Sequence, residues 1–123
     1  MIPRGRGKII NICSLTSDLG RQTIAPYAAS KGGVKMLTRG MCADWARYGI
    51  QVNGLAPGYV LTDMNQDLVE DQVFDAWVRQ RTPAGRWSQP EELVGAAVFL
   101  ASAASDFVNG QVLIVDGGIS AVL

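Results

Sequence analysis

A tyrosine and a lysine stand four residues apart in the stretch PYAASKGG, at Tyr27 and Lys31. Residues four apart on a helix lie on one face, so the two side chains are expected to meet. The pKa of a free tyrosine is about 10, and a nearby ammonium stabilises the phenolate and lowers this value. The pair therefore predicts a group that gives or takes a proton near neutral pH.

Ser14 closely follows the isoleucine-rich run KIINI, residues 8–12, which has the pattern of a buried strand. Open parallel sheets bind ligands beyond the carboxyl ends of their strands. A serine hydroxyl placed there could hold a carbonyl oxygen while Tyr27 transfers the proton. Ser14, Tyr27 and Lys31 together predict the interconversion of a ketone and an alcohol.

Each of these features also has a purely structural interpretation. A tyrosine–lysine pair on an exposed helix contributes at most about 0.5 kcal/mol and needs no function. Ser14 could be a loop hydroxyl, Pro57-Gly58 a turn and Thr62 a helix N-cap. Asn53, on a predicted strand, is expected to make structural hydrogen bonds. The joint spacing favours chemistry because no structural role requires all of these residues together.

The charge and composition argue against several other functions. The sequence balances 11 basic against 11 acidic residues over 123 positions, so no charge field predicts a nucleic-acid or membrane partner. No apolar run reaches the length of a membrane span, and the basic N-terminus lacks the apolar stretch of a signal peptide. We therefore expect a cytoplasmic protein. Cys13 and Cys42 have no histidine to accompany them, which favours buried, reduced thiols over a disulfide or a metal site.

Strand and helix signals alternate along the chain through short turns. Strands are predicted at residues 8–12, 50–55 and 111–115. Helices are predicted at residues 26–48, 63–80 and 90–103. This alternation predicts an α/β fold, a parallel sheet with crossover helices.

The helix patterns also predict individual contacts. The apolar side of the first helix should consist of Val34, Leu37, Met41 and Trp45. Ser88 and Glu91 have the spacing of a capping box in front of the last helix.

The joint pattern closely resembles the C-terminal half of a short-chain dehydrogenase/reductase over essentially the whole chain. IINICS is similar to the family's strand with the catalytic serine, and YAASK is similar to its catalytic tyrosine and lysine. VNGLAPGYVLTDM resembles the segment whose Pro-Gly turn and threonine hold the nicotinamide. FDAWVRQRTPAGRW followed by PEEL looks most like gluconate 5-dehydrogenases and related sugar-acid or polyol oxidoreductases. Acyl-carrier-protein reductases share most of the same residues.

The resemblance implies an NAD(P)-dependent oxidoreductase that interconverts a secondary alcohol and a ketone. The implied substrate is a sugar acid such as gluconate or 5-ketogluconate, with a 3-oxoacyl thioester as the alternative. Tyr27 is implied as the acid–base residue, Lys31 as the residue that activates it and binds the cofactor ribose, and Ser14 as the residue that orients the carbonyl. The implied cofactor-binding residues are Tyr27, Lys31, Pro57, Gly58, Val60 and Thr62. The pattern does not distinguish NAD from NADP, and it implies no metal.

The sequence departs from the family in what it lacks. Its 14 glycines form neither Gly-x-x-x-Gly-x-Gly nor Gly-x-Gly-x-x-Gly, the turn that cradles the cofactor pyrophosphate. It also has no match for the residue that selects NAD or NADP, or for the asparagine of the family's catalytic set. We therefore expect residues 1–123 to be the C-terminal half of a Rossmann-like domain, truncated to its last three strands, without the N-terminal dinucleotide-binding half.

Two further expectations follow from this departure. The isolated chain should be inactive, because it lacks the pyrophosphate site. It should also form a homo-oligomer, because the strand at residues 8–12 loses a neighbour and natural proteins normally cover such an edge. The alternative function is a truncated, non-catalytic module for oligomerisation or interaction.

Overall fold

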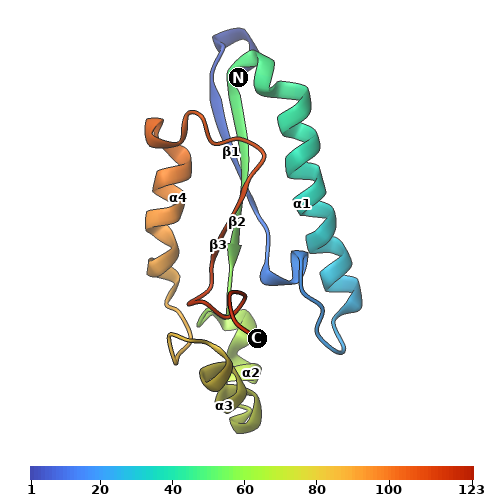
Figure 1. Cartoon of the computed structure of the whole chain (residues 1–123), viewed down its shortest axis with the longest axis vertical. Helices are drawn as coiled ribbons and strands as arrows, with labels where there is room; N and C mark the ends of the chain where they lie inside the picture. The colour runs from blue at the N-terminus through green and yellow to red at the C-terminus, as the bar shows by residue number, and fades with distance from the viewer.

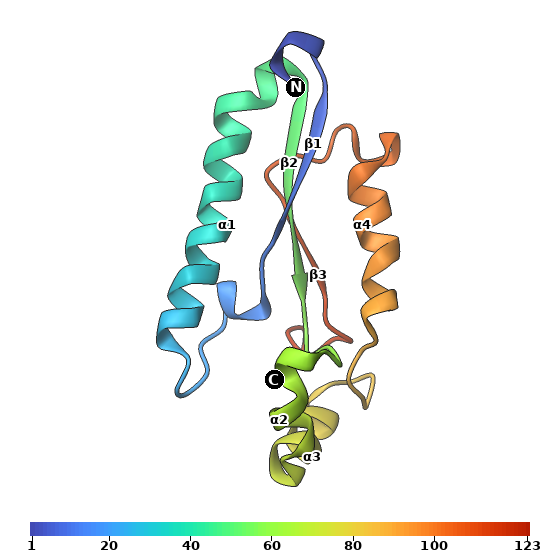
Figure 2. The same cartoon turned by 180° about the vertical axis from the view of Figure 1, so that it is seen from behind.

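A three-stranded parallel sheet lies at the centre of the computed structural model, which describes residues 1–123. Its strands are β1 (Gly7–Ile12), β2 (Ile50–Pro57) and β3 (Val112–Val115), in the order β1-β2-β3. Helix α1 (Ala25–Trp45) covers one face of the sheet and helix α4 (Val94–Ala101) the other, as Figures 1 and 2 show from opposite sides. The predicted α/β fold with crossover helices is confirmed.

Two short helices, α2 (Gln66–Glu70) and α3 (Gln72–Arg81), lie beyond the carboxyl ends of the strands. Figure 1 shows them at the same end of the molecule as the C-terminus and the loop between β1 and α1. Short 3-10 turns occupy residues 2–4, 15–17, 46–48, 63–65, 90–93 and 103–105. The loops at this end are therefore gathered where a parallel sheet binds its ligands.

The core is built around β2, which has neighbouring strands on both sides. Val52, Leu55 and Ala56 are buried, because a helix covers each face of this central strand. Asn53 is buried as well, and both polar atoms of its amide are hydrogen-bonded: Nδ2 donates to the Val108 carbonyl at 2.8 Å, and Oδ1 accepts from the Gln111 N–H at 3.1 Å. The structural role expected for Asn53 is confirmed.

Strand β1 is an edge strand that pairs with β2 alone. Its residues are half-buried except Ile12, of which 54% is exposed. On the outer face of α1, 60% of Met36 and 55% of Leu37 are exposed. Only 15 of the 123 residues are buried, so much of the apolar surface of the fold faces outward.

The single helix predicted at residues 63–80 is wrong, because the chain breaks it at Asp71. The backbone of Asp71 is extended (φ −72°, ψ 102°). Its carboxylate accepts hydrogen bonds from the N–H groups of Val73 at 3.0 Å and Phe74 at 3.2 Å. An aspartate in this position starts a new helix, so α3 begins here instead of continuing α2.

The capping box predicted at Ser88 and Glu91 lies one residue further on, at Gln89 and Glu92. The Glu92 carboxylate accepts from the Gln89 N–H at 2.8 Å. Ser88 cannot begin the turn, because its own N–H donates to the Tyr59 carbonyl at 2.9 Å and holds it in an extended segment.

The apolar side predicted for the first helix is wrong at Leu37, which points outward, while Thr38 is completely buried. The Thr38 hydroxyl donates to the Val34 carbonyl at 2.9 Å and accepts from the Asn11 amide at 2.9 Å. A buried hydroxyl is tolerated when its hydrogen bonds are made. The Asn11–Thr38 bond thereby ties β1 to α1.

We expect Gly49→Ala to destabilise the protein more than Gly85→Ala. Both glycines have left-handed φ values, 71° and 73°, which cost an alanine about 1–2 kcal/mol. A Cβ at Gly49 would also lie 2.2 Å from the Gly5 carbonyl oxygen, whereas nothing lies within 4 Å of one at Gly85. Urea unfolding should show at least about 1 kcal/mol more loss for Gly49→Ala. Equal losses would show that the close approach of the two backbones does not matter.

Candidate active site

The predicted site residues lie at one end of the sheet. Ile12, the last residue of β1, pairs with Leu55 in the parallel register of β2. Ser14 therefore follows β1 close to the point where Pro57 and Gly58 end β2. This end of a parallel sheet is where ligands bind.

The first turns of α1 hold Tyr27 and Lys31. Pro26 lies in the first turn of the helix, where its missing N–H costs nothing. The Lys31 Nζ lies 5.8 Å from the centre of the Tyr27 ring, so the expected meeting of the two side chains is confirmed. The same ammonium donates to the Ile12 carbonyl at 2.9 Å. This bond fixes the start of α1 at the end of β1.

The loop after β1 is bound to the same part of α1. The Ser17 hydroxyl donates to the Lys31 carbonyl at 2.9 Å and accepts from the Ser14 N–H at 3.2 Å. One turn further along the helix, Lys35 forms an ion pair with Asp18. These contacts hold Ser14 next to the turn of the helix that bears Lys31.

The hydroxyl groups of Ser14 and Tyr27 are both available to a ligand. The Ser14 Oγ accepts from the Thr16 N–H at 3.2 Å and from the Thr16 hydroxyl at 3.0 Å. Since a hydroxyl has two acceptor positions and one donor, the donor of Ser14 remains free. Tyr27 is 42% exposed, and its contact with Ser30 uses only its main-chain carbonyl.

The turn after β2 requires a glycine. Pro57 pairs with Val115 of β3, and the Gly58 N–H donates to the Val115 carbonyl at 2.9 Å. A Cβ at Gly58 would lie 2.7 Å from the Cα of Asp116. A side chain at this position would displace the backbone after β3, so the turn depends on this close approach.

Val60 and Thr62, which follow this turn, differ in what they offer a ligand. Val60 is buried, and its carbonyl accepts from the Asn65 amide at 2.8 Å. Thr62 is exposed at the N-cap position of residues 63–65, and its side chain forms no capping bond. A cavity of about 300 Å³ lies beside it, lined by Leu61, Thr62, Asp63, Gln66, Val69 and Glu70.

A second cavity, of about 290 Å³, lies beside the loop after β1. It is lined by Leu15, Thr16, Leu19, Gly20, Arg21, Tyr59, Trp77, Arg81 and Ile119. Through Thr16, whose hydroxyl contacts Ser14, it adjoins the candidate catalytic group. The two cavities share no lining residue. The structure thus places Lys31 beside Tyr27 and beside the loop that holds Ser14, while Thr62 lies at a separate cavity.

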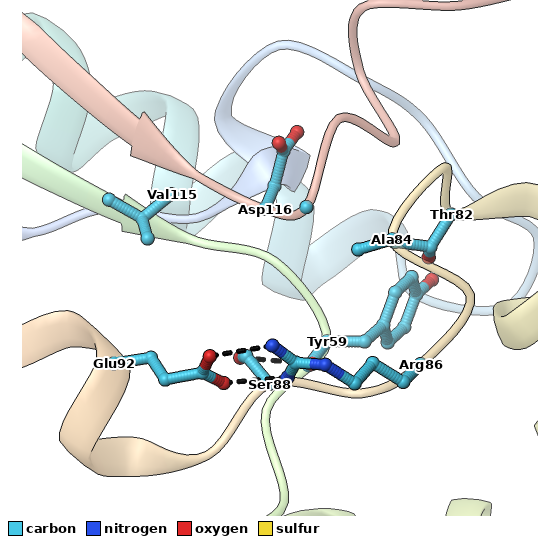
Figure 3. Close-up of a pocket in the computed structure, with 9 residues that line it drawn as sticks. Tyr59, Thr82, Ala84, Arg86, Ser88, Glu92, Val115 and Asp116 are labelled. Carbon is cyan, nitrogen blue, oxygen red and sulfur yellow. Dashed lines mark hydrogen bonds and ion pairs between the residues drawn. The ribbon is translucent and has the colours of Figure 1, made fainter.

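A smaller cavity of about 90 Å³, shown in Figure 3, contains titratable groups that are not suited to catalysis. Arg86 forms two hydrogen bonds of 2.7 Å with Glu92, which Figure 3 shows facing each other. The Arg86 guanidinium, helped by the Gln89 N–H, lowers the pKa of Glu92 to about 2. Burial raises the pKa of Tyr59, whose ring packs edge-on against Trp87 at 5.5 Å. Glu92 is therefore ionised and Tyr59 neutral near pH 7, and neither group is suited to proton transfer there.

The two cysteines are free thiols, with Cys13 buried and Cys42 only half-buried. Burial raises the pKa of the Cys13 thiol, although the Thr38 hydroxyl and Lys31 oppose this. The structure holds no cluster of residues suited to a metal ion. None of its helices combines the length and apolar character needed to cross a membrane.

Several residues of the site were missed by the sequence prediction. Thr16 and Ser17, which hold Ser14, stand in the same loop, and the Ser14–Ser17 spacing is that of a capping box. Asn11 and Thr38 contact each other across 27 positions of sequence, so no local pattern shows their pairing. Arg21 lies in the loop before α1, and no acidic residue stands four positions away to pair with it. This missing partner was the only sign in the sequence that its charge is unpaired.

Comparisons with known proteins agree with the family resemblance seen in the sequence. A family model described as Enoyl-(Acyl carrier protein) reductase matches residues 1–120. The chain is 67% identical to gluconate 5-dehydrogenase of Gluconobacter oxydans over 123 residues, 100% of this chain and 48% of that protein. It is also 67% identical to 5-keto-D-gluconate 5-reductase of Escherichia coli K12 over 118 residues, 96% of this chain and 46% of that protein.

A solved structure of a related protein also matches the fold of this chain. It is a gluconate 5-dehydrogenase from Burkholderia cenocepacia J2315 in complex with NADP and tartrate, with a TM-score of 0.98 and 69% identity. The match covers 99% of this chain and 48% of that one. The chain spans about half the length of the curated relatives it matches.

Proposed function

Since the chain belongs to the short-chain dehydrogenase/reductase family, we propose that it supplies the acid–base site of an NAD(P)-dependent oxidoreductase. The enzyme interconverts a secondary alcohol and a ketone, with a sugar acid such as gluconate or 5-ketogluconate as substrate. The observation that best supports this proposal is the contact between Lys31 and the Tyr27 ring, next to a serine whose hydroxyl donor is free.

The three residues divide the proton chemistry between them. Tyr27 takes the proton of the substrate hydroxyl during oxidation and returns it during reduction. Ser14 donates a hydrogen bond to the same oxygen and holds it beside the phenol. Lys31 stabilises the phenolate by its positive charge. An ammonium has three donors, and the Ile12 carbonyl uses one, so two remain for the cofactor ribose.

The cofactor residues fit the nicotinamide side of NAD(P). Thr62 is exposed with an uncommitted hydroxyl, which suits a carboxamide. In the turn that begins at Pro57, the Gly58 carbonyl and the Val60 N–H make no hydrogen bond within the chain and are available to the cofactor. When bound, the nicotinamide supplies or accepts the hydride. None of the 14 glycines belongs to a pyrophosphate-binding turn, so these 123 residues fit only part of the cofactor. The relative from Burkholderia cenocepacia is described with NADP, which makes NADP the first cofactor to test.

The names of the relatives favour a sugar acid as the substrate. Two curated relatives act on gluconate or its 5-keto derivative. The solved relative was crystallised with tartrate, a hydroxylated dicarboxylate. The description of the family model names an enoyl thioester on acyl carrier protein, which shares the thioester but not the keto group of the alternative substrate, a 3-oxoacyl thioester. Turnover of 5-ketogluconate, compared with that of a 3-oxoacyl thioester under the same conditions, distinguishes the two.

A function without catalysis is the second candidate. In this case the chain acts only as an oligomerisation or interaction module. Exposed apolar residues on α1 and at the end of β1 favour it, including Met36, Leu37 and Ile12. A stable oligomer that never binds cofactor in any assembly would support this candidate over the enzyme.

We also propose a homo-oligomer in the cytoplasm. The unpaired edge of β1 exposes backbone donors and acceptors, and natural proteins usually cover such an edge. The exposed side of α1 adds apolar surface to be covered. Two free cysteines fit a reducing compartment.

Tyr27→Phe should lower turnover by about a hundredfold or more in an active assembly that contains these residues, because it removes the proton donor. Lys31→Ala should also lower turnover strongly, because it removes the charge beside the phenol. Tyr48→Phe is the matched control, since Tyr48 lies beyond the far end of α1, and it should keep normal turnover. Near-normal turnover of Tyr27→Phe would exclude the acid–base role.

The purified 123-residue chain should bind NADH and NADPH only weakly. Its residues offer no cradle for the pyrophosphate, and each charge-assisted hydrogen bond that is missing costs about 1.5–3 kcal/mol. Cofactor fluorescence during a titration measures the affinity. A micromolar Kd would contradict the expectation that these residues bind only the nicotinamide side.

Ile10→Asp should disrupt folding and assembly together, because it places an unpaired charge in the half-buried edge strand. Val73→Asp, at a position that is 81% exposed, should change neither. Size-exclusion chromatography with light scattering at micromolar concentration measures the assembly, and thermal unfolding measures stability. If the unaltered chain were a monodisperse monomer that unfolds cooperatively, the proposed oligomer would be wrong.

A further inference from the structure

The cavity of about 290 Å³ beside Thr16 concentrates positive charge. Arg21 and Arg81 line it, and no acidic residue does. The four ion pairs of the chain join Lys8 to Asp106, Lys35 to Asp18, Arg79 to Asp75 and Arg86 to Glu92. Both arginines of the cavity thus lack a carboxylate partner within the chain.

The guanidinium of Arg21 is positioned so that its donors stay free. Its central carbon lies over the ring of Phe74, 5.0 Å from the ring centre. The arginines that donate side-chain hydrogen bonds are Arg39, Arg79, Arg81 and Arg86, so the N–H groups of Arg21 are uncommitted. Arg81 gives one N–H to the Val122 carbonyl at 2.7 Å and retains the others. A planar, uncommitted guanidinium is the group that best binds a carboxylate through two parallel hydrogen bonds.

The position of Arg21 connects this cavity to the candidate catalytic residues. Arg21 lies in the loop that runs from Ser14 to Tyr27, and Thr16, which also lines the cavity, donates its hydroxyl to Ser14 at 3.0 Å. Near the end of the loop Thr23 has a left-handed φ of 70°, a conformation that β-branched residues rarely adopt.

We propose that Arg21, with Arg81 as a second cation, binds the carboxylate of the substrate in this cavity. The enzyme would thereby select sugar acids over neutral polyols of the same length. The inference rests on the proposed function, because it places the reacting carbon at Ser14 and Tyr27. In gluconate the carboxylate is separated from the reacting carbon by several carbon–carbon bonds. Arg21 lies seven residues after Ser14 in the same loop, so the carboxylate and the reacting carbon would contact different parts of that loop.

The test compares two ligands that differ only at one end. D-Gluconate has a carboxylate where D-glucitol has a neutral CH₂OH group. Each is titrated into the protein, with and without NADPH, and binding is followed by tryptophan fluorescence, since Trp77 lines the cavity. The unaltered protein should bind gluconate at least about tenfold more tightly than glucitol. Arg21→Gln should abolish most of this preference, because it should weaken the binding of gluconate and leave that of glucitol unchanged.

Two further variants control the experiment. Arg47 also lies over an aromatic ring, 4.9 Å from the centre of Tyr48, so Arg47→Gln tests for a general loss of a surface cation and should change neither affinity. Arg21→Lys keeps the charge but loses the two parallel hydrogen bonds, so its gluconate affinity should lie between those of the unaltered protein and Arg21→Gln.

The outcomes separate this inference from the proposed function. Equal or undetectable binding of gluconate and glucitol by the unaltered protein would overturn the inference. An Arg21→Gln variant that lost affinity equally for gluconate and glucitol would also overturn the inference. Charge-selective binding that depends on Arg21 would support it even if Tyr27→Phe retained turnover, which would contradict the proposed function alone.

Discussion

The hydrogen bond from the Lys31 ammonium to the Ile12 carbonyl joins the two elements on which the candidate site depends. It fixes the first turns of α1 against the end of β1, and the same ammonium faces the ring of Tyr27. The Ser17 hydroxyl binds the Lys31 main chain and so brings the serine loop to the same place. The Lys31 side chain thus has both a structural and an electrostatic role.

The parallel sheet explains why these residues can meet at all. Strands that run in one direction end at one edge, so the loops after β1, β2 and β3 are neighbours although they are far apart in sequence. The buried Asn53 strengthens this arrangement by binding the connection that leads to β3. Two cavities lie among the loops of this end, one beside Thr62 and one beside Thr16.

The sequence predicted the elements well where local patterns determine them. The strand predicted at 50–55 lies within β2, and its neighbours in the sheet make it the central strand. The break at Asp71 escaped prediction because apolar spacing continues across it, while a single capping carboxylate decides the geometry. The burial of Thr38 escaped because its partner, Asn11, belongs to another element. The charge of the cavity at Arg21 likewise arises only when separate segments fold together.

The measurement that tests the central claim most directly is a crystal structure of an active assembly containing this chain, with a nicotinamide cofactor and 5-ketogluconate bound. If Ser14 and Tyr27 form the acid–base site, Ser14 Oγ and Tyr27 Oη will both lie within about 3 Å of one keto oxygen. A keto oxygen bound away from these two hydroxyls, in a complex that still turns over, would contradict the account.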